Sequence, residues 1–277
     1  MTRMNVQAAV TLGQLQNKLD LISHNVANLN TTGYKTRSAN FSSLIQQNIN
    51  NFRDVEENAT GRQTPHGIRL GSGARIGHTN VNLSVGSLNV TGRGLDIALL
   101  EDNHLLQVEL TDGDVTETRF TRDGSLYLNT LDNGQMMITT SEGHPVIGQD
   151  GAAIIFDDSI EGISINEIGQ IVTVRDGVEV IEGQLGLVQA IRPQFLEPVG
   201  GNTFRMPDLT ESAYVAEEIL IEVDPFENAI QSGTLEQSNV DLATQMAELL
   251  QTQRAYQYNA RTITMHDQMR GLINQLR

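Results

Sequence analysis

"LGQLQNKLDLISHNVANLNTTGYK", residues 12–35, carries a regular apolar pattern that breaks off into Asn, Thr and Gly. Together with Ala8, its apolar residues recur at alternating intervals of four and three. This spacing predicts one helix over residues 4–30, whose a and d positions form a stripe of about three heptads. The stripe consists of Ala8, Leu12, Leu15, Leu19, Ile22, Val26 and Leu29.

Two interpretations of this helix are open. It can be an ordinary amphipathic helix that lies on its own domain, although such helices usually show a wider apolar face. The narrow stripe favours a coiled-coil-like partner, either elsewhere in the chain or on another chain.

The break after the helix has a physical explanation in its side chains. Asn28, Asn30, Thr31 and Thr32 can compete for backbone hydrogen bonds, and Gly33 can adopt the left-handed conformation that ends a helix. A short apolar pattern then resumes as a helix or an extended segment. It consists of Phe41, Leu44 and Ile45. Residues 46–66 are polar without a period and are predicted to be a loop or a segment ordered by a partner.

From residue 68 to residue 228 the apolar period changes to two, as in "ARIGHTNVNLSVGSLNVTG" and "QIVTVRDGVEVIEGQ". Asx-Gly pairs between such runs are a strong hairpin signal. These pairs are Asp112-Gly113, Asp123-Gly124, Asn133-Gly134, Asp150-Gly151 and Asp176-Gly177. They predict an antiparallel β domain of roughly ten to fourteen short strands.

The last stretch returns to a helical period. Asn239 and Asp241 are both plausible N-caps of a helix of about 35 residues. One apolar stripe consists of Leu242, Met246, Leu249, Tyr256, Ala260 and Ile263, and a shifted stripe of Met265, Met269, Leu272 and Leu276. The long helices at the two ends can bury their stripes by pairing with each other or with neighbouring chains.

The predicted fold is therefore mixed: a mainly antiparallel β middle domain with long N- and C-terminal α-helices that pair in a coiled-coil-like tube. The expected boundaries are 1–45 for the N-terminal helix and its loop and 46–75 for an extended segment. The β domain is expected over 76–228 and the C-terminal helix over 229–277.

Composition limits the function. The net charge of −16 argues against nucleic acid or anionic lipid as a partner, because basic residues must neutralise phosphates. The absence of cysteine excludes disulfides and thiolate catalysis. No apolar run approaches the roughly 20 residues that span a bilayer. The first 20 residues lack a secretory apolar region, so we expect no membrane insertion and no cleaved signal peptide.

No catalytic or metal-ligating set stands out in the sequence. The six histidines are scattered, and "GSGARIG" lacks the Lys-Ser/Thr of a phosphate loop. The acidic pair Asp112 and Asp114 is followed by Glu117 where a calcium loop needs glycine. The sequence therefore predicts no enzyme, no cofactor and no metal.

Two distant segments resemble the signatures of the bacterial flagellar rod and hook proteins. "LDLISHNVANLNTTGYKTRSANFSSLI", residues 19–45, is similar to the family's helix followed by Ala-Asn-x-x-Thr-x-Gly-Phe/Tyr-Lys. "SNVDLATQMAELLQTQRAYQYNARTITMHDQM", residues 238–269, is similar to its C-terminal signature. "LDIALL" and "FTRDGSL" resemble middle-domain motifs, although the family's Gly-Phe-Phe segment is replaced by "LLEDNHLLQVEL".

The resemblance implies a structural subunit that polymerises into the axial tube of the flagellar basal body and transmits torque for motility. The implied partners are further copies, adjacent rod and hook subunits and the flagellar type III export apparatus, which would deliver the chain without a cleaved signal. The chain length looks more like a distal rod subunit than the larger hook subunit. The residues expected to carry assembly are Leu12, Leu15, Leu19, Ile22, Val26, Leu242, Met246, Leu249, Tyr256 and Ile263. Those expected to fix the turn and a subunit contact are Asn28, Thr32, Gly33 and Tyr34.

Two other functions stay open from the sequence. A hook subunit differs from a rod subunit in forming a curved polymer. A secreted β-domain enzyme or carbohydrate-binding module, with helical ends packed internally, predicts a stable monomer with a ligand cleft; the few aromatic residues, 4% of the chain, count against sugar stacking.

Overall fold

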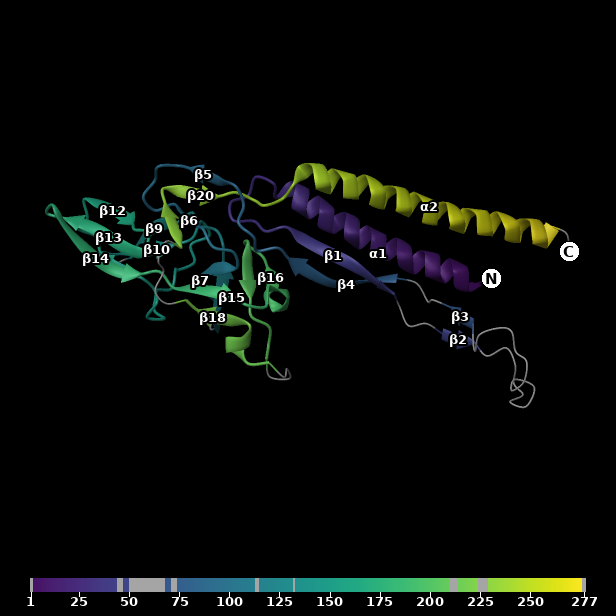
Figure 1. The fold of residues 1–277 in the computed structure, drawn as a ribbon, viewed down its shortest axis with the longest axis horizontal. Coiled ribbons are helices and arrows are strands. Elements are labelled where there is room, and N and C mark those ends of the chain that lie inside the picture. Colours follow the sequence, from purple (N-terminus) through teal and green to yellow (C-terminus); the bar gives the residue numbers. More distant parts are fainter. Residues whose placement is uncertain are drawn as a thin grey trace. The chain divides into compact units, whose positions relative to one another are not determined.

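The computed structural model describes residues 2–43, 47–49, 68–70, 74–112, 115–131, 133–209, 214–223 and 229–275. They form two compact units, each built from segments that are separated in sequence (Figure 1). Unit 1 contains residues 1–24, 38–79 and 243–277, and unit 2 contains residues 25–37 and 80–242. The predicted fold class, two terminal helices around a mainly antiparallel β region, is confirmed.

Helices α1 (Thr2–Ala27) and α2 (Leu242–Gln275) supply most of unit 1. They run antiparallel, and Lys18 Nζ of α1 lies 3.6 Å from Glu248 Oε2 of α2 (Figure 1). α1 ends three residues before its predicted end, because residues 28–30 already form turns. α2 begins directly after Asp241, so of the two predicted N-caps only Asp241 occupies that position.

Strands β1 (Arg37–Ser43) and β4 (Ala74–Val81) form a two-stranded sheet beside α1. The backbone N–H of Ile76 donates to Gln14 Oε1 at 2.8 Å, and Lys18 Nζ lies 5.7 Å from the centre of the Phe41 ring. The segment around Phe41, residues 37–43, is therefore extended and not helical. Leu44 and Ile45 lie outside the described residues.

The predicted loop over 46–66 is wrong at its start, because β2 (Gln47–Ile49) pairs antiparallel with β3 (Ile68–Leu70). The rest of that segment, residues 50–66, lies outside the described residues.

Unit 2 is built around a six-stranded antiparallel sheet in the order β16-β17-β8-β7-β15-β18. Its strands are β7 (His104–Asp112), β8 (Val115–Thr121), β15 (Leu187–Ala190), β16 (Glu197–Val199), β17 (Thr203–Arg205) and β18 (Leu220–Glu222). Two short 3-10 helices, η1 (Pro193–Phe195) and η2 (Ala216–Glu218), connect strands at its edges.

Two three-stranded sheets and two strand pairs complete unit 2. One sheet contains β9 (Tyr127–Thr130), β10 (Gln135–Thr139) and β11 (Ile155–Asp157), and the other β12 (Gly162–Ile165), β13 (Gln170–Arg175) and β14 (Val178–Gln184). The strand pairs join β5 (Leu88–Val90) to β20 (Thr234–Glu236) and β6 (Ile97–Leu99) to β19 (Ile230–Ser232). The described residues therefore hold more strands than the sequence predicted, because many have only three residues.

The Asx-Gly turns are partly as predicted. Asp176 and Gly177 both have positive φ, 49° and 73°, and join β13 to β14 as a two-residue hairpin turn. Gly134 lies in the hairpin between β9 and β10. The prediction of a hairpin at Asp123-Gly124 is wrong, because β8 and β9 belong to different sheets. Gly124 packs directly against the Ile97 carbonyl oxygen. Gly113 lies outside the described residues.

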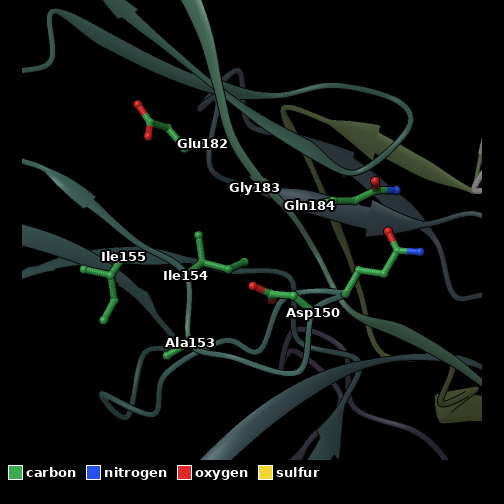
Figure 2. A pocket seen from close by; sticks show the side chains of 8 residues that line it. Asp150, Ala153, Ile154, Ile155, Glu182, Gly183 and Gln184 are labelled. Carbon is green, nitrogen blue, oxygen red and sulfur yellow. The ribbon is translucent and has the colours of Figure 1, made fainter.

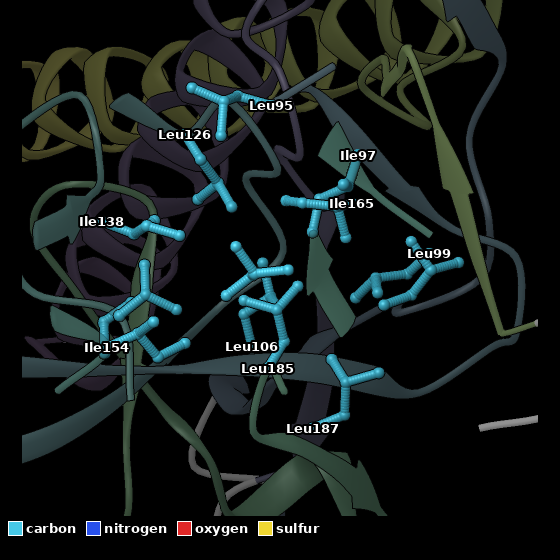
Figure 3. Packing of buried hydrophobic residues seen from close by; sticks show 14 of the residues in the cluster. Leu95, Ile97, Leu99, Leu106, Leu126, Ile138, Ile154, Ile165, Leu185 and Leu187 are labelled. Atoms are coloured by element: carbon cyan, nitrogen blue, oxygen red, sulfur yellow. The ribbon is translucent and has the colours of Figure 1, made fainter. Parts of the chain in front are cut away.

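The main core of unit 2 consists mostly of aliphatic side chains from several sheets, together with Phe156, in keeping with an aromatic content of 4% (Figure 3). Leu106, Val108, Leu126, Ile138 and Leu185 are completely buried in it. A second cluster around Leu105, Phe120 and Phe204 packs on the other face of the six-stranded sheet. This double core makes unit 2 a rigid support for the segments of the chain that lead into the two helices.

Candidate functional site

The loop after α1 is an internal turn of unit 2. Gly33 has a φ of +63°, and its N–H donates to the Glu236 carbonyl oxygen at 2.8 Å. A Cβ at this position would lie 2.5 Å from the Arg122 carbonyl oxygen, so the turn needs glycine both for its conformation and for its space. The turn in "NTTGYK" therefore lets Gly33 lie in close contact with two distant segments of the same chain, at Arg122 and at Glu236.

The last turn of α1 is fixed by Asn25 and Tyr34. The Tyr34 hydroxyl donates to Asn25 Oδ1 at 2.9 Å, and Asn25 Nδ2 donates to the Arg37 carbonyl oxygen at 2.8 Å. Both side chains are buried, and burial raises the pKa of Tyr34. The phenol therefore stays protonated, as a donor must.

Lys35, Arg122 and Glu236 form a buried ion cluster, which we call the junction cluster. Lys35 Nζ lies 2.5 Å from Glu236 Oε1, and Arg122 Nε lies 2.7 Å from Glu236 Oε2. Each of the three residues is about 1% exposed. The carboxylate of Glu236, which stands six positions before α2, thus contacts Lys35 in the loop after α1 and Arg122 directly after β8.

Backbone groups complete the cluster. The Arg122 guanidinium donates to the carbonyl oxygens of His104, Leu99 and Glu101, at 2.9, 3.1 and 2.8 Å. Lys35 Nζ also donates to the Ser84 carbonyl oxygen at 2.6 Å. A buried ion pair stabilises a protein only when such additional hydrogen bonds offset the loss of hydration.

Burial first and the Arg122 charge second lower the pKa of Lys35 to about 8, against the opposing effect of the Glu236 carboxylate. Lys35 is therefore protonated at neutral pH and serves as a counterion of Glu236. Its proton is nevertheless held less tightly than that of an exposed lysine.

Further side chains tie the same segments together. Asn239 Oδ1 accepts from the Thr36 N–H at 2.8 Å and from its hydroxyl at 2.7 Å, and Asn239 Nδ2 donates to the Ser84 carbonyl oxygen. The Thr32 hydroxyl donates to Asp123 Oδ1 at 3.0 Å. Residues 25–37 and 233–240, which flank the two helices in sequence, are thereby fixed in one rigid arrangement.

The sequence analysis missed Lys35, Arg122 and Glu236, although all three lie in quoted or adjacent segments. Each stands two or three residues from a glycine that makes a close turn, namely Gly33, Gly124 and Gly233. That spacing is a weak signal, and no local pattern pairs residues 200 positions apart.

The predicted assembly residues of α1 lie on its inward face. Leu15 is 7% exposed and Ile22 is fully buried, while Leu12, Leu19 and Val26 are half-buried. Of the predicted turn residues, Gly33 and Tyr34 are buried inside unit 2, and Asn28 and Thr32 are half-buried. The structure thus brings the α1 stripe together on one face and places the turn residues elsewhere.

The predicted stripe of α2 is more accessible than that of α1. Leu242, Met246 and Tyr256 are 42%, 43% and 36% exposed, and Leu249 and Ile263 are half-buried. The buried residues of α2 are polar instead: Gln245, Thr252 and His266. The apolar stripe is therefore not the buried face of α2 in the single chain, and its role in assembly stays a prediction.

A further apolar surface of α2 is exposed. Leu250 is 54% exposed and Tyr258 is 66% exposed, and both line a shallow hollow with Ala247, Gln251 and Arg254. Farther along the helix the exposed apolar residues are Met265, Met269, Leu272 and Ile273. We call Leu250, Tyr258, Met265, Met269 and Leu272 the outer face of α2.

No catalytic arrangement emerges from the described residues. A polar hollow of about 450 Å³ in unit 2 is lined by Gln149, Asp150, Ala153, Ile154, Ile155, Glu182, Gly183 and Gln184 (Figure 2). Its carboxylates are already engaged: Glu182 lies 2.8 Å from Arg175 Nη2, and Asp150 accepts from the Ala152 N–H. The described residues hold no cluster of three or more His, Asp or Glu that could bind a metal. None of the described helices is long and apolar enough to cross a membrane.

The same segments that carry this geometry match known protein families. Residues 7–35 match the flagella basal body rod protein model, and residues 231–276 match the C-terminal model of the flagellar basal body rod FlgEFG proteins. Residues 100–173 match the D1 domain of the flagellar hook protein FlgE/F/G. The chain is also 40% identical over 280 residues to the flagellar hook-basal body complex protein FlhP of Bacillus subtilis, with 100% of both chains covered. It belongs to the flagellar rod and hook protein family.

Other relatives in this family are similar over nearly their whole length. The flagellar basal-body rod protein FlgG of Buchnera aphidicola is 33% identical over 94% of each chain, and FlgG of Bacillus subtilis is 30% identical over 94% of this chain and 93% of its own. This is a family of structural proteins. The N-terminal match ends on Lys35, and the C-terminal match includes Glu236. The family signatures in this chain therefore contain two of the three residues of the junction cluster.

Proposed function

We propose that this chain is a structural subunit of the flagellar basal-body rod, most like the distal rod, which polymerises through its terminal helices into the axial tube. Its partners are further copies and the adjacent rod and hook subunits. Torque passes along the tube wall, and motility depends on it. The flagellar type III export apparatus delivers the chain.

The observation that carries this proposal is the outer face of α2. Five large apolar side chains recur along one side of a 34-residue helix and are each more than half exposed. An exposed apolar stripe of this length is typical of a surface that a partner covers. In a homopolymer the same stripe is covered in every subunit, so its burial energy is repeated along the tube.

The stripe is also suited to a helical partner. Its members follow one another at spacings of eight, seven, four and three residues, which place them on one side of the helix. Arg254 and Arg261 lie on the same side and can pair with acidic residues at the rim of a contact. Helix-in-groove packing of this kind needs no ligand pocket and no catalytic residue.

The test uses the double substitution Leu250→Asp and Tyr258→Asp in the host bacterium. Both side chains are exposed, so we expect the free chain to fold and to be exported, while rods and swimming are lost. Val178→Asp is the matched control, because Val178 is 61% exposed on β14 and belongs to unit 2, whereas Leu250 and Tyr258 belong to unit 1. Intact rods with the double variant would contradict the proposal, and purified polymers that are curved and supercoiled would assign the chain to the hook.

A further inference from the structure

The polar hollow of unit 2 lies between the edges of two different sheets (Figure 2). Residues 153–155, at the start of β11, line one wall, and residues 182–184, at the end of β14, line the other. β11 is the last strand in the order β11-β10-β9, and β14 is the last in the order β12-β13-β14. Among the described residues, each of these two strands therefore has a neighbouring strand on one side only.

The backbone of β11 has one edge that faces β10 and one that faces away. The Ile138 N–H donates to the Ile154 carbonyl oxygen at 3.3 Å, in register with the β10–β11 ladder. Because these groups alternate along an antiparallel strand, the N–H and C=O groups of Ile155 and Asp157 point away from β10. The Asp157 carbonyl oxygen accepts from Arg175 Nη2 of β13 at 3.4 Å, which fits this direction. At Ile155, which lines the hollow, the same edge can pair with an added strand.

A β-bulge places Glu182 on the opposite wall. The register of the β13–β14 ladder shifts between Ile171 and Val172, so that Glu182 of β14 is left without a paired residue. Glu182 Oε1 accepts from the Thr173 hydroxyl at 2.7 Å and lies 2.8 Å from Arg175 Nη2. Its Oε2 has no hydrogen-bond partner among the described residues and can receive a further cation.

The surroundings of the hollow are strongly acidic. Between residues 149 and 184 the chain has eight Asp and Glu residues and one basic residue, Arg175. Asp150 is exposed at the rim of the hollow, where its Oδ1 accepts from the Ala152 N–H. A partner that enters this site gains from positive charge, whereas an acidic partner is repelled.

We propose that the hollow binds an extended, basic peptide segment of a partner protein, which adds as a strand to the free edge of β11. Its backbone pairs with the outward groups of Ile155, and a Lys or Arg side chain reaches Glu182 Oε2 and Asp150. A neighbouring apolar side chain covers Ile155, which is 44% exposed. The inference goes beyond the proposed function, because the site lies in unit 2 and uses no residue of α1 or α2.

The test measures binding of a probe to the purified full-length chain by fluorescence anisotropy. The probe is a short fluorescein-labelled peptide in which Lys and Val alternate. The hollow variant is Asp150→Asn with Glu182→Gln, which removes two charges and keeps the side-chain shapes. The matched control is Glu197→Gln with Glu217→Gln, which removes two charges at exposed positions of unit 2 outside the hollow.

We expect the dissociation constant of the probe to rise about tenfold or more in the hollow variant and to change far less in the control. Equal affinities of the hollow variant and the control would overturn the inference. Asp150→Asn alone, at an exposed turn, serves where the double variant fails to fold, and an unchanged affinity in it would count equally against the inference.

A second probe separates strand addition from simple charge attraction. It has the same side chains, but every backbone nitrogen is methylated, so it cannot donate to a strand edge. We expect it to bind the wild type about tenfold more weakly than the first probe. Equal affinities of the two probes would overturn strand addition. Dimers of the unlabelled full-length chain in sedimentation, if the hollow variant abolishes them, would assign the hollow to a second copy of the chain and overturn the proposal as well.

Discussion

At the residue scale, Glu236 determines how the segments next to the helices are held. Its carboxylate accepts from Lys35 and Arg122 and also from the Gly86 N–H at 2.6 Å, and its carbonyl oxygen accepts from the Gly33 N–H. Its side chain is 1% exposed. Removing one partner of a buried ion pair leaves the other charges desolvated and unpaired, which costs more than the pair itself contributes.

Glu236→Gln should therefore destabilise unit 2 strongly. The amide keeps the shape of the side chain but leaves two buried cations without a counterion, and we expect a loss of about 3 kcal/mol or more in the free energy of unfolding. Guanidinium titration, followed by circular dichroism, measures it. The matched control is Glu197→Gln, which breaks an exposed ion pair of 2.7 Å with Arg205 and should shift the midpoint far less. Equal shifts would mean that the cluster contributes no more than a surface pair.

Lys35 should make the stability of unit 2 depend on pH in the alkaline range. Its pKa is about 8 in the folded chain and 10.5 in its ordinary state, so between these values the folded chain has released a proton that the unfolded chain retains. Stability rises with pH wherever the unfolded state binds more protons, by about 2 kcal/mol from this group between pH 7.5 and pH 9.5.

The measurement is the difference in free energy of unfolding between the wild type and Lys35→Met at those two pH values. Other titrating groups largely cancel in this difference. We expect it to shift in favour of the wild type at the higher pH. A difference that stays constant would show that Lys35 keeps its proton throughout and has an ordinary pKa.

At the scale of the elements, the sequence predicted the type and approximate bounds of those helices and strands whose apolar residues recur with a regular local period. α1 and α2 carry heptad spacing, and β13 and β14 carry alternation around Asp176-Gly177, so their type and approximate bounds could be derived. Which face of α2 is buried could not be derived, because two apolar stripes share that helix with the buried polar residues Gln245, Thr252 and His266. The choice depends on α1, whose Gln14 and Lys18 side chains also contact β4 and β1.

The junction cluster could not be predicted for a different reason. Charged residues are normally exposed, so Lys35, Arg122 and Glu236 gave no local sign of burial. Only the folded β unit brings these three residues together. The sequence indicated the neighbouring turn at Gly33, through its Asn-Thr-Gly composition, but not the cluster itself.

Leu19→Asp tests α1 as an assembly element. Leu19 is half-buried in the α1 stripe, and a carboxylate there would be desolvated whenever the helix is covered. We expect rods to be absent while the guanidinium midpoint of unit 2, which does not contain Leu19, stays unchanged. Gln16→Asp adds the same charge at an exposed position of α1 and should leave assembly intact. Rods formed by Leu19→Asp would exclude the α1 stripe from assembly.

At the scale of the whole molecule, unit 2 is discontinuous in sequence. Residues 25–37 belong to it although more than 40 residues of unit 1 separate them from residue 80. They supply Gly33, Lys35 and Thr36, whose partners Glu236 and Asn239 stand just before α2. Residues 25–37 and the segment just before α2 are therefore held within unit 2 by the same set of side chains.

Truncation should reveal this dependence. A chain of residues 25–242 keeps the complete junction cluster, whereas a chain of residues 80–242 leaves the Arg122–Glu236 pair without Lys35 and leaves Asn239 without Thr36. We expect the shorter chain to unfold at a clearly lower guanidinium concentration. Lys35→Met in the longer chain should remove part of that difference, because it deletes one contact among several. Equal midpoints for the two truncated chains would mean that residues 25–37 add no stability to unit 2, and the stabilising role of Lys35 and Thr36 would then have to be abandoned.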